Sequence, residues 1–264
     1  MTVKDIMACI TEIAPLHWQE HYDNAGIQVG DFNAEVHKAL ICLDITEEIV
    51  DEAIAKNCDL IVSHHPLIFH GLKHITPETY IERAVTKALK HDIAMISMHT
   101  NLDNSYLGVS RVLAGKLGLT NLCLLQPSEA EPENCGAGMV GEFETPLDEQ
   151  GFLSLVAETI GSPCLRHSAL IGRKIKKVAL CGGSGMPFMS DALRQQADAY
   201  LTADVKYHDF FVPEGRILLV DGGHFETEQF TKQLIKELIQ KKIPTFAAEI
   251  AETNTNAVLY FCKK

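Results

Sequence analysis

Short apolar segments alternate with segments of helical spacing along the first hundred residues. The apolar runs cover 38–44 (KALICLD), 59–63 (DLIVS) and 93–98 (IAMISM), whereas 47–57 and 77–91 carry apolar residues at helical spacing. Strands that alternate with helices in this way form largely parallel sheets with helices on their faces. This rhythm predicts an α/β fold built from β-α-β units.

The second half of the chain repeats the pattern. Residues 38–42 align with 177–181 at an offset of 139 positions, and without a gap 57–63 then aligns with 196–202. A further apolar run at 216–221 corresponds to the third run, 93–98, at a slightly different offset. Any two β-α-β units are somewhat alike, but the shared cysteine, shared aspartate and equal spacing favour a duplicated unit. We therefore expect two similar α/β halves with mixed, mostly parallel sheets.

The expected halves are residues 1–125 and 126–264, and the arrangement leaves the last strand able to pack back on the first half. A length of 264 residues suits one large domain or two small ones. Proline and glycine are frequent between 120 and 170, which predicts loops that join the halves.

The charge balance disfavours nucleic acid as a partner. The chain has 23 Lys and Arg against 35 Asp and Glu, a formal net charge of -12. An acidic chain repels phosphate unless it carries a local basic patch. The densest basic run, 173–177, precedes a strand and is interpreted as a solvated edge.

The cysteines and the N-terminus indicate a reducing compartment. The 8 cysteines include no CxxC pair, and several lie in apolar runs, where cysteine behaves as a small hydrophobic residue. The first 15 residues contain acids and read as an amphipathic helix rather than a signal peptide. No apolar stretch is long enough to span a membrane. We expect a cytoplasmic protein with reduced thiols and no membrane partner.

The first segment that suggests chemistry is Ser63-His64-His65-Pro66, directly after a strand. Adjacent histidines at a strand end point in different directions, so each could bind one of two neighbouring metal ions. The alternative is a chance pair in a chain with 12 histidines.

A second segment, 98–104 (MHTNLDN), follows the third strand. Asp103 supplies a hard oxygen donor that can bridge two metals, and its alternative role is a helix N-cap. His99 is the candidate catalytic residue, as a proton carrier or a partner of a ligand. Its alternative role is a capping or core histidine.

The third segment, 221–228 (DGGHFETE), opens a helix expected to run through 229–241. His224 and Glu228 stand at i and i+4, so they face the same way, which is a common two-ligand spacing. Glu226 lies off that face and is expected to be exposed to solvent. A helix N-terminus also favours an acid without any metal, which is the alternative for Glu228.

Taken together, the three segments supply three histidines and two carboxylates at strand ends, where α/β sheets bind ligands. These donors suit Zn, Fe, Mn, Ni or Co. Two bridged ions would generate a hydroxide nucleophile near neutral pH. We therefore expect two divalent transition-metal ions per chain. A fourth segment, 181–185 (CGGSG), could cradle a phosphate with its backbone N–H groups, although it matches neither GxGxxG nor a Walker A loop.

The motifs SHHPLIF, HTNLD and GGHFETE, in this order, resemble the Nif-three-like family of dinuclear metal proteins, the GTP cyclohydrolase 1 type 2 homologues. The segment 22–30 (YDNAGIQVG) is similar to a family segment that usually begins with Trp instead of Tyr22. The resemblance assigns the metal ligands to His64, His65, Asp103, His224 and Glu228, with the two acids as bridges. It also implies a site in the cleft between two halves, a ring-shaped homohexamer and no inserted middle domain.

The function implied by this resemblance is a metal-dependent hydrolase, GTP cyclohydrolase 1 type 2-like, in which a metal-bound hydroxide attacks a small-molecule substrate. A nucleotide is the candidate substrate, although the chain has neither a P-loop nor an NKxD motif. The alternative is a metal-binding regulatory or scaffold protein that acts through protein partners without catalysis.

Overall fold

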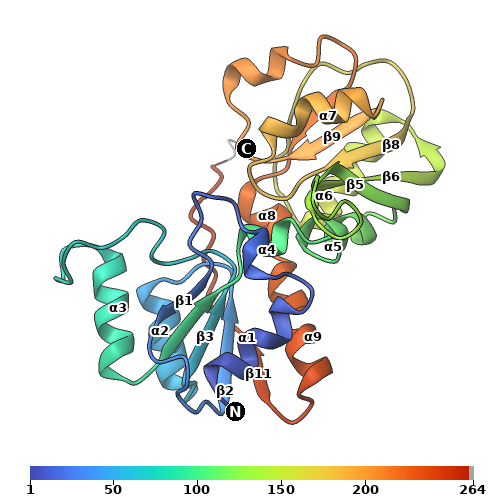
Figure 1. Ribbon diagram of the computed structural model, residues 1–264. Helices are drawn as coiled ribbons and strands as arrows, with labels where there is room; N and C mark the ends of the chain where they lie inside the picture. Colours follow the sequence, from blue (N-terminus) through green and yellow to red (C-terminus); the bar gives the residue numbers. More distant parts are fainter. Residues whose placement is uncertain (262–264) are drawn as a thin grey trace. The chain divides into compact units, whose positions relative to one another are not determined.

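The computed structural model describes residues 1–261, which form two compact units (Figure 1). Unit 1 comprises 1–102 and 231–257, and unit 2 comprises 103–230 and 258–261 of the described residues. These units differ from the expected halves, 1–125 and 126–264, since 103–125 belongs to unit 2 and 231–257 belongs to unit 1. Cys262 lies outside the described residues.

Unit 1 contains a five-stranded sheet in the order β1-β4-β3-β2-β11. Its strands are β1 Gly26–Val29, β2 Lys38–Cys42, β3 Leu60–Ser63, β4 Ala94–Ser97 and β11 Ala247–Ile250. All neighbours pair in parallel except β1, which is antiparallel to β4. The three predicted apolar runs form β2, β3 and β4, and nearly all of their residues are buried, as a parallel sheet covered on both faces requires.

Helices cover both faces of this sheet (Figure 1). The helical elements of this part of the chain are α1 Val3–Thr11, η1 Leu16–Trp18, α2 Glu47–Ala55, α3 Tyr80–Lys90, α4 Thr100–Asp103, whose last residue belongs to unit 2, and α9 Thr231–Lys242. Helices α2 and α3 pack together on one face, and α1 packs with α9 on the other. Capping boxes that start at Thr2 and Thr79 fix the first turns of α1 and α3.

Unit 2 contains a six-stranded sheet in the order β5-β6-β8-β9-β10-β7. The strands are β5 Thr120–Pro127, β6 Gly136–Leu147, β7 Arg166–His167, β8 Ile175–Leu180, β9 Ala199–Thr202 and β10 Leu218–Asp221. The helical elements are α5 Val109–Lys116, α6 Glu149–Ile160, η2 Met186–Phe188, α7 Met189–Arg194, η3 Tyr207–Phe211 and α8 His224–Glu228. Strands β8, β9 and β10 pair in parallel, whereas the pairs β5–β6, β6–β8 and β10–β7 are antiparallel. The α/β class with mixed, mostly parallel sheets is confirmed.

The prediction of loops between 120 and 170 is wrong, because this region forms β5, β6 and α6. The glycines that suggested loops lie inside β6, where neighbouring backbone approaches closely. A Cβ atom on Gly138 would lie 2.7 Å from Leu180 O, and one on Gly136 would collide with Gln126 O. Glycine inside a strand marks such an approach as often as it marks a turn.

The sheet register agrees with the 139-residue repeat. Ala39 pairs with Leu60 in unit 1, and Val178 pairs with Ala199 in unit 2, so both partners shift by 139 positions. The shared aspartate also has the same role in each copy. The carboxylate of Asp59 accepts from the N–H of Lys38, and that of Asp198 accepts from the N–H of Lys177. These matching hydrogen bonds support the interpretation of β2–β3 and β8–β9 as a duplicated unit.

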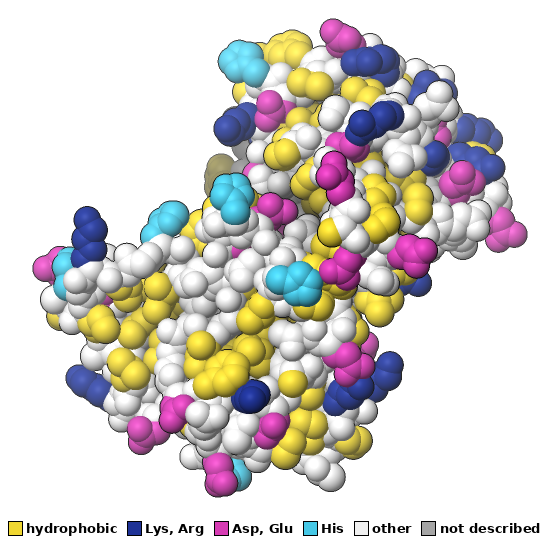
Figure 2. All heavy atoms as spheres, viewed as in Figure 1, with side chains coloured by type: hydrophobic (Ala, Val, Ile, Leu, Met, Phe, Trp, Pro, Cys, Tyr) yellow, Lys and Arg dark blue, Asp and Glu magenta, His cyan; other side chains and the backbone are white. Residues whose placement is uncertain are grey.

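Within the described chain, no helix combines the length and the apolar character that crossing a membrane would require. The seven described cysteines are all free thiols. On the face that Figure 2 shows, Lys and Arg side chains are interspersed with Asp and Glu.

Candidate metal centre

Two adjacent histidines follow β3 and are oriented through their Nδ1 atoms. His64 is fully buried, and its Nδ1 lies 2.8 Å from the Met98 carbonyl oxygen. The Nδ1 of His65 lies 2.7 Å from Oδ1 of Asp44. Because Nδ1–H donates in both contacts, Nε2 is the atom that each ring offers as a metal ligand.

A third imidazole, His99, follows β4 and is held by Asp23. The Asp23 carboxylate accepts from Nδ1 of His99 at 2.8 Å, and from the N–H and hydroxyl of Thr100 at 3.0 and 2.5 Å. Burial raises the pKa of Asp23, but these hydrogen bonds lower it to about 2. Asp23 is therefore a permanent anion that fixes the His99 ring with its Nε2 available.

These three imidazoles converge within unit 1. Each of His64, His65 and His99 offers a nitrogen, and the three nitrogens lie within 4.8 Å of one another. The His99 ring centroid lies 5.3 Å from that of His64 and 5.4 Å from that of His65. Imidazoles whose second nitrogen is bonded to a carboxylate or carbonyl are typical of metal sites.

Sequence reasoning missed Asp44 as part of this cluster. Burial raises its pKa, but the hydrogen bond and charge of His65 lower it further, so the carboxylate stays ionised beside that ring. A signal was present, because Asp44 comes two residues after β2, and the carboxyl ends of β2 and β3 are neighbours in a parallel pair.

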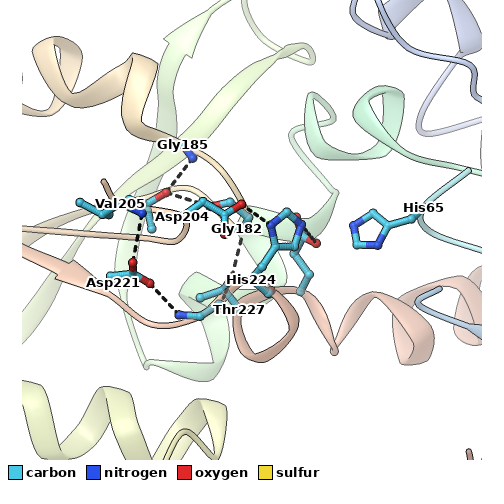
Figure 3. Close-up of polar contacts among 12 residues, drawn as sticks. His65, Gly182, Gly185, Asp204, Val205, Asp221, His224 and Thr227 are labelled. Carbon is cyan, nitrogen blue, oxygen red and sulfur yellow. Dashed lines mark hydrogen bonds and ion pairs between the residues drawn. The ribbon is translucent and has the colours of Figure 1, made fainter. Parts of the chain in front are cut away.

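In unit 2, His224 and Glu228 begin and end the short helix α8. Their i, i+4 spacing places Nε2 of His224 3.0 Å from Oε2 of Glu228, as predicted from the helix geometry. On its other side, Nδ1 of His224 lies 2.7 Å from Oδ2 of Asp204 (Figure 3). The N–H of Val205 donates to Asp221, which fixes the turn that presents Asp204.

The two carboxylates make this position attractive to positive charge. Burial lowers the pKa of His224, but the hydrogen bonds to Asp204 and Glu228 outweigh it and raise that pKa to about 11. A divalent cation bound to Nε2 of His224 would be attracted by the same two carboxylates that favour the protonated ring. The donor set, one imidazole nitrogen with carboxylate oxygens, fits a transition-metal ion.

Asp103 also belongs to unit 2, and it is not a helix N-cap. It is the last residue of α4, and the next helix, α5, begins after Gly108. Burial raises the pKa of the Cys181 thiol, and the negative charges of Asp103 and Glu228 raise it further. Both acids therefore act on the same thiol, which stays protonated.

The glycine loop after β8 supports Glu228 and does not form an open phosphate cradle. The N–H groups of Gly182, Gly183 and Gly185 donate to the hydroxyls of Ser110, Thr227 and Thr202, respectively. Gly183 has φ +62°, and a Cβ atom there would collide with Oε1 of Glu228. The loop thus packs its bare backbone against that carboxylate.

The prediction that Glu226 faces solvent is wrong, since this side chain is buried. The prediction placed Glu226 on the solvent-exposed face of a single helix that runs from 224 through 241. The chain instead forms two helices, α8 and α9, which belong to different units. Positions on the short helix therefore do not continue the faces of the long one.

A family model described as Duf34/NIF3 (NGG1p interacting factor 3) matches residues 1–257. A Clostridium perfringens protein named GTP cyclohydrolase 1 type 2 homolog is 32% identical over 246 residues, which are 92% of this chain and 93% of that protein. A Clostridium acetobutylicum protein of the same name is 33% identical over 231 residues, covering 86% and 85%.

Solved structures share the fold. A Bacillus cereus protein described as related to NIF3 superposes with a TM-score of 0.93 at 23% identity, over 99% of both chains. A Staphylococcus aureus protein superposes with a TM-score of 0.90 at 27% identity, again over 99% of both.

Proposed function

Because the chain belongs to the Duf34/NIF3 family, we propose that it is a metal-dependent hydrolase of the GTP cyclohydrolase 1 type 2 kind. The observation that carries the proposal is the set of oriented imidazoles: each of His64, His65 and His224 has Nδ1 bonded to an oxygen acceptor. The names of the relatives support the choice of a nucleotide as substrate.

We assign two divalent transition-metal ions to the ligands that the motifs indicate. These are His64, His65, Asp103, His224 and Glu228, with the two carboxylates as bridges. The nitrogen and oxygen donors fit Zn, Fe, Mn, Ni or Co. When bound, such a pair of ions activates water near neutral pH and stabilises negative charge on the substrate.

Residues around the ligands hold them in orientation. Asp44 fixes His65 and Asp204 fixes His224, each through a 2.7 Å hydrogen bond to Nδ1. His99 remains the candidate catalytic residue, because Asp23 holds its Nδ1 and leaves Nε2 to exchange a proton with substrate. For a purine nucleotide, the reaction would be hydrolysis at C8 of the imidazole ring with release of formate.

The first test is metal content by elemental analysis of the whole chain purified without chelator. We expect about two ions per chain in the wild type, and a loss of metal in His64→Ala and Glu228→Ala. His37→Ala is the matched control, since His37 also bonds a carboxylate, Asp59, but is 78% exposed and takes no part in the cluster. Two tightly bound ions in both ligand variants would contradict the assignment.

The second test is the reaction itself. The metal-loaded chain should release formate from GTP, and the chelator-treated chain should not. A metal-loaded chain that releases no formate would instead favour a regulatory or scaffold role.

That second role has its own support. The family description names an interacting factor, and unit 2 exposes Tyr207 and Phe211, with ring centroids 5.8 Å apart. We also propose a homo-oligomer, a hexameric ring, whose mass light scattering would measure.

A further inference from the structure

The segment 22–30 (YDNAGIQVG) holds the loop that follows the histidine pair. The side-chain amide of Asn24 donates to Ile68 O at 2.6 Å, and Gln28 Oε1 accepts from Ile68 N at 3.1 Å. Gln28 in turn donates from Nε2 to Asn24 O at 2.6 Å. Backbone hydrogen bonds at Ile68 therefore fix the position of Phe69 relative to this segment.

The two segments bring together a pair of exposed aromatic rings, Tyr22 and Phe69. Tyr22 is 56% exposed and Phe69 is 36% exposed. Their ring centroids are 6.4 Å apart, with the planes inclined by 54°. Single exposed aromatic residues are ordinary on protein surfaces, but an adjacent exposed pair on a backbone held by hydrogen bonds is typical of a binding surface.

These two rings lie next to the imidazole cluster of unit 1, His64, His65 and His99. The Phe69 centroid lies 6.1 Å from that of His99, and His99 lies 5.3 Å from His64. Tyr22 directly precedes Asp23, the residue that holds His99. The same short segment therefore orients an imidazole with one side chain and presents an exposed ring with the next.

We propose that Tyr22 and Phe69 form an aromatic platform on which the planar heteroaromatic ring of the substrate stacks beside the metal-binding histidines. This inference rests on the proposed function and adds how its substrate is recognised. Aromatic side chains bind bases through their faces, and every base offers such a face. Because the side chains of Asn24 and Gln28 hold the backbone of the platform before any ligand arrives, little further ordering of that backbone opposes binding.

The platform accounts for recognition in a chain without a guanine-binding motif. Stacking recognises a planar ring and tolerates different substituents at its edge, so the platform predicts binding of nucleotides with different bases rather than of guanine nucleotides alone. Exposed His70, whose ring centroid lies 5.0 Å from that of Phe69, adds a polar group at the platform edge.

The test compares a nucleotide with its phosphate chain alone. Binding of GTP and of inorganic tripolyphosphate to the metal-loaded whole chain is measured by titration calorimetry. We expect Tyr22→Ala and Phe69→Ala each to weaken GTP binding by about fivefold or more, with tripolyphosphate binding unchanged. Tyr22→Phe should retain GTP affinity, because it keeps the ring. Tyr80→Ala is the control, since Tyr80 is 52% exposed in the same unit but begins α3.

Equal GTP affinity in the wild type and both alanine variants would overturn the platform, as would a metal-loaded wild type that binds no GTP. A change in oligomeric mass without a change in GTP affinity would also overturn it, because the rings would then contact a second copy of the chain. Metal content, measured on the same samples, separates the two proposals. A wild type that holds no metal counts against the proposed function. If the wild type and both alanine variants hold metal and bind GTP equally well, only the platform is contradicted.

Discussion

Replacing Gly183 by alanine should release metal without unfolding the chain. The backbone of Gly183 lies against the carboxylate of Glu228, and an added Cβ atom would collide with its Oε1. The peptide N–H of Gly183 also donates to Thr227 Oγ1 at 3.1 Å. Either Glu228 or the loop must therefore move, and Glu228 is the residue assigned as a bridging ligand.

Two separate costs are expected from this substitution. The left-handed conformation of Gly183, φ +62°, costs an alanine about 1–2 kcal/mol of folding stability. Displacement of a ligand from its supported position typically weakens metal binding about 10–100-fold. The second cost exists only if Glu228 binds metal.

Gly161→Ala isolates the first cost. Gly161 has φ +67°, close to that of Gly183, and a Cβ atom there meets nothing within 4 Å. Thermal unfolding of the chelator-treated proteins gives the strain of each variant, and competition with a chelator gives metal affinity. We expect both variants to lose stability and only Gly183→Ala to lose metal affinity. Unchanged metal affinity in Gly183→Ala would refute the role of the loop as a support for Glu228.

Three further predictions concern other parts of the chain. Burial raises the pKa of Glu52, but hydrogen bonds from Lys56, Thr253 and the backbone of 252–253 lower it to about 2 from 4.5. Because the folded pKa is the lower one, this stabilisation is present above pH 4.5 and is lost as the pH falls towards 2. Glu52→Gln should therefore cost about 1–3 kcal/mol at pH 7 and clearly less at pH 3 by urea unfolding; an equal cost at both would contradict the assignment. Asp44→Asn should weaken metal binding about 10–100-fold in chelator competition, and wild-type affinity would show that His65 needs no carboxylate. Tyr200→Phe removes a buried hydroxyl that donates to Gly185 O at 2.5 Å, and should cost about 1–3 kcal/mol in thermal unfolding; an unchanged midpoint would show that another donor replaces it.

The parallel strands could be predicted from sequence because both of their faces are buried. Runs such as 60–63 and 199–202 are buried throughout and mostly apolar, and their spacing indicates the repeat that the sheet register reproduces. Strand β6 could not be recognised in the same way. Its glycines are needed for close backbone approach, which depends on neighbours that are remote in sequence.

The candidate site was predictable where a ligand pair is local in sequence. His224 and Glu228 face each other because of helix geometry alone, and the reasoning needed only their spacing. The carboxylates that orient the histidines were missed, because Asp23 and Asp44 lie 76 and 21 positions from the rings they contact. These aspartates contact the histidines because of the order of the strands in the sheet, and a single sequence does not give that order directly.

The repeat has a consequence for how such a centre could arise. At the 139-residue offset, His65 at the end of β3 corresponds to Asp204 at the end of β9, and Asp204 bonds His224. In a symmetric assembly of identical single units, every substitution would appear in both copies, so one strand end could not carry the proposed ligand His65 while its equivalent carried the carboxylate Asp204. Fusion of the copies into one gene removes that constraint. The tandem chain can thus specialise its two ancestral strand ends separately, which an unfused homodimer cannot do.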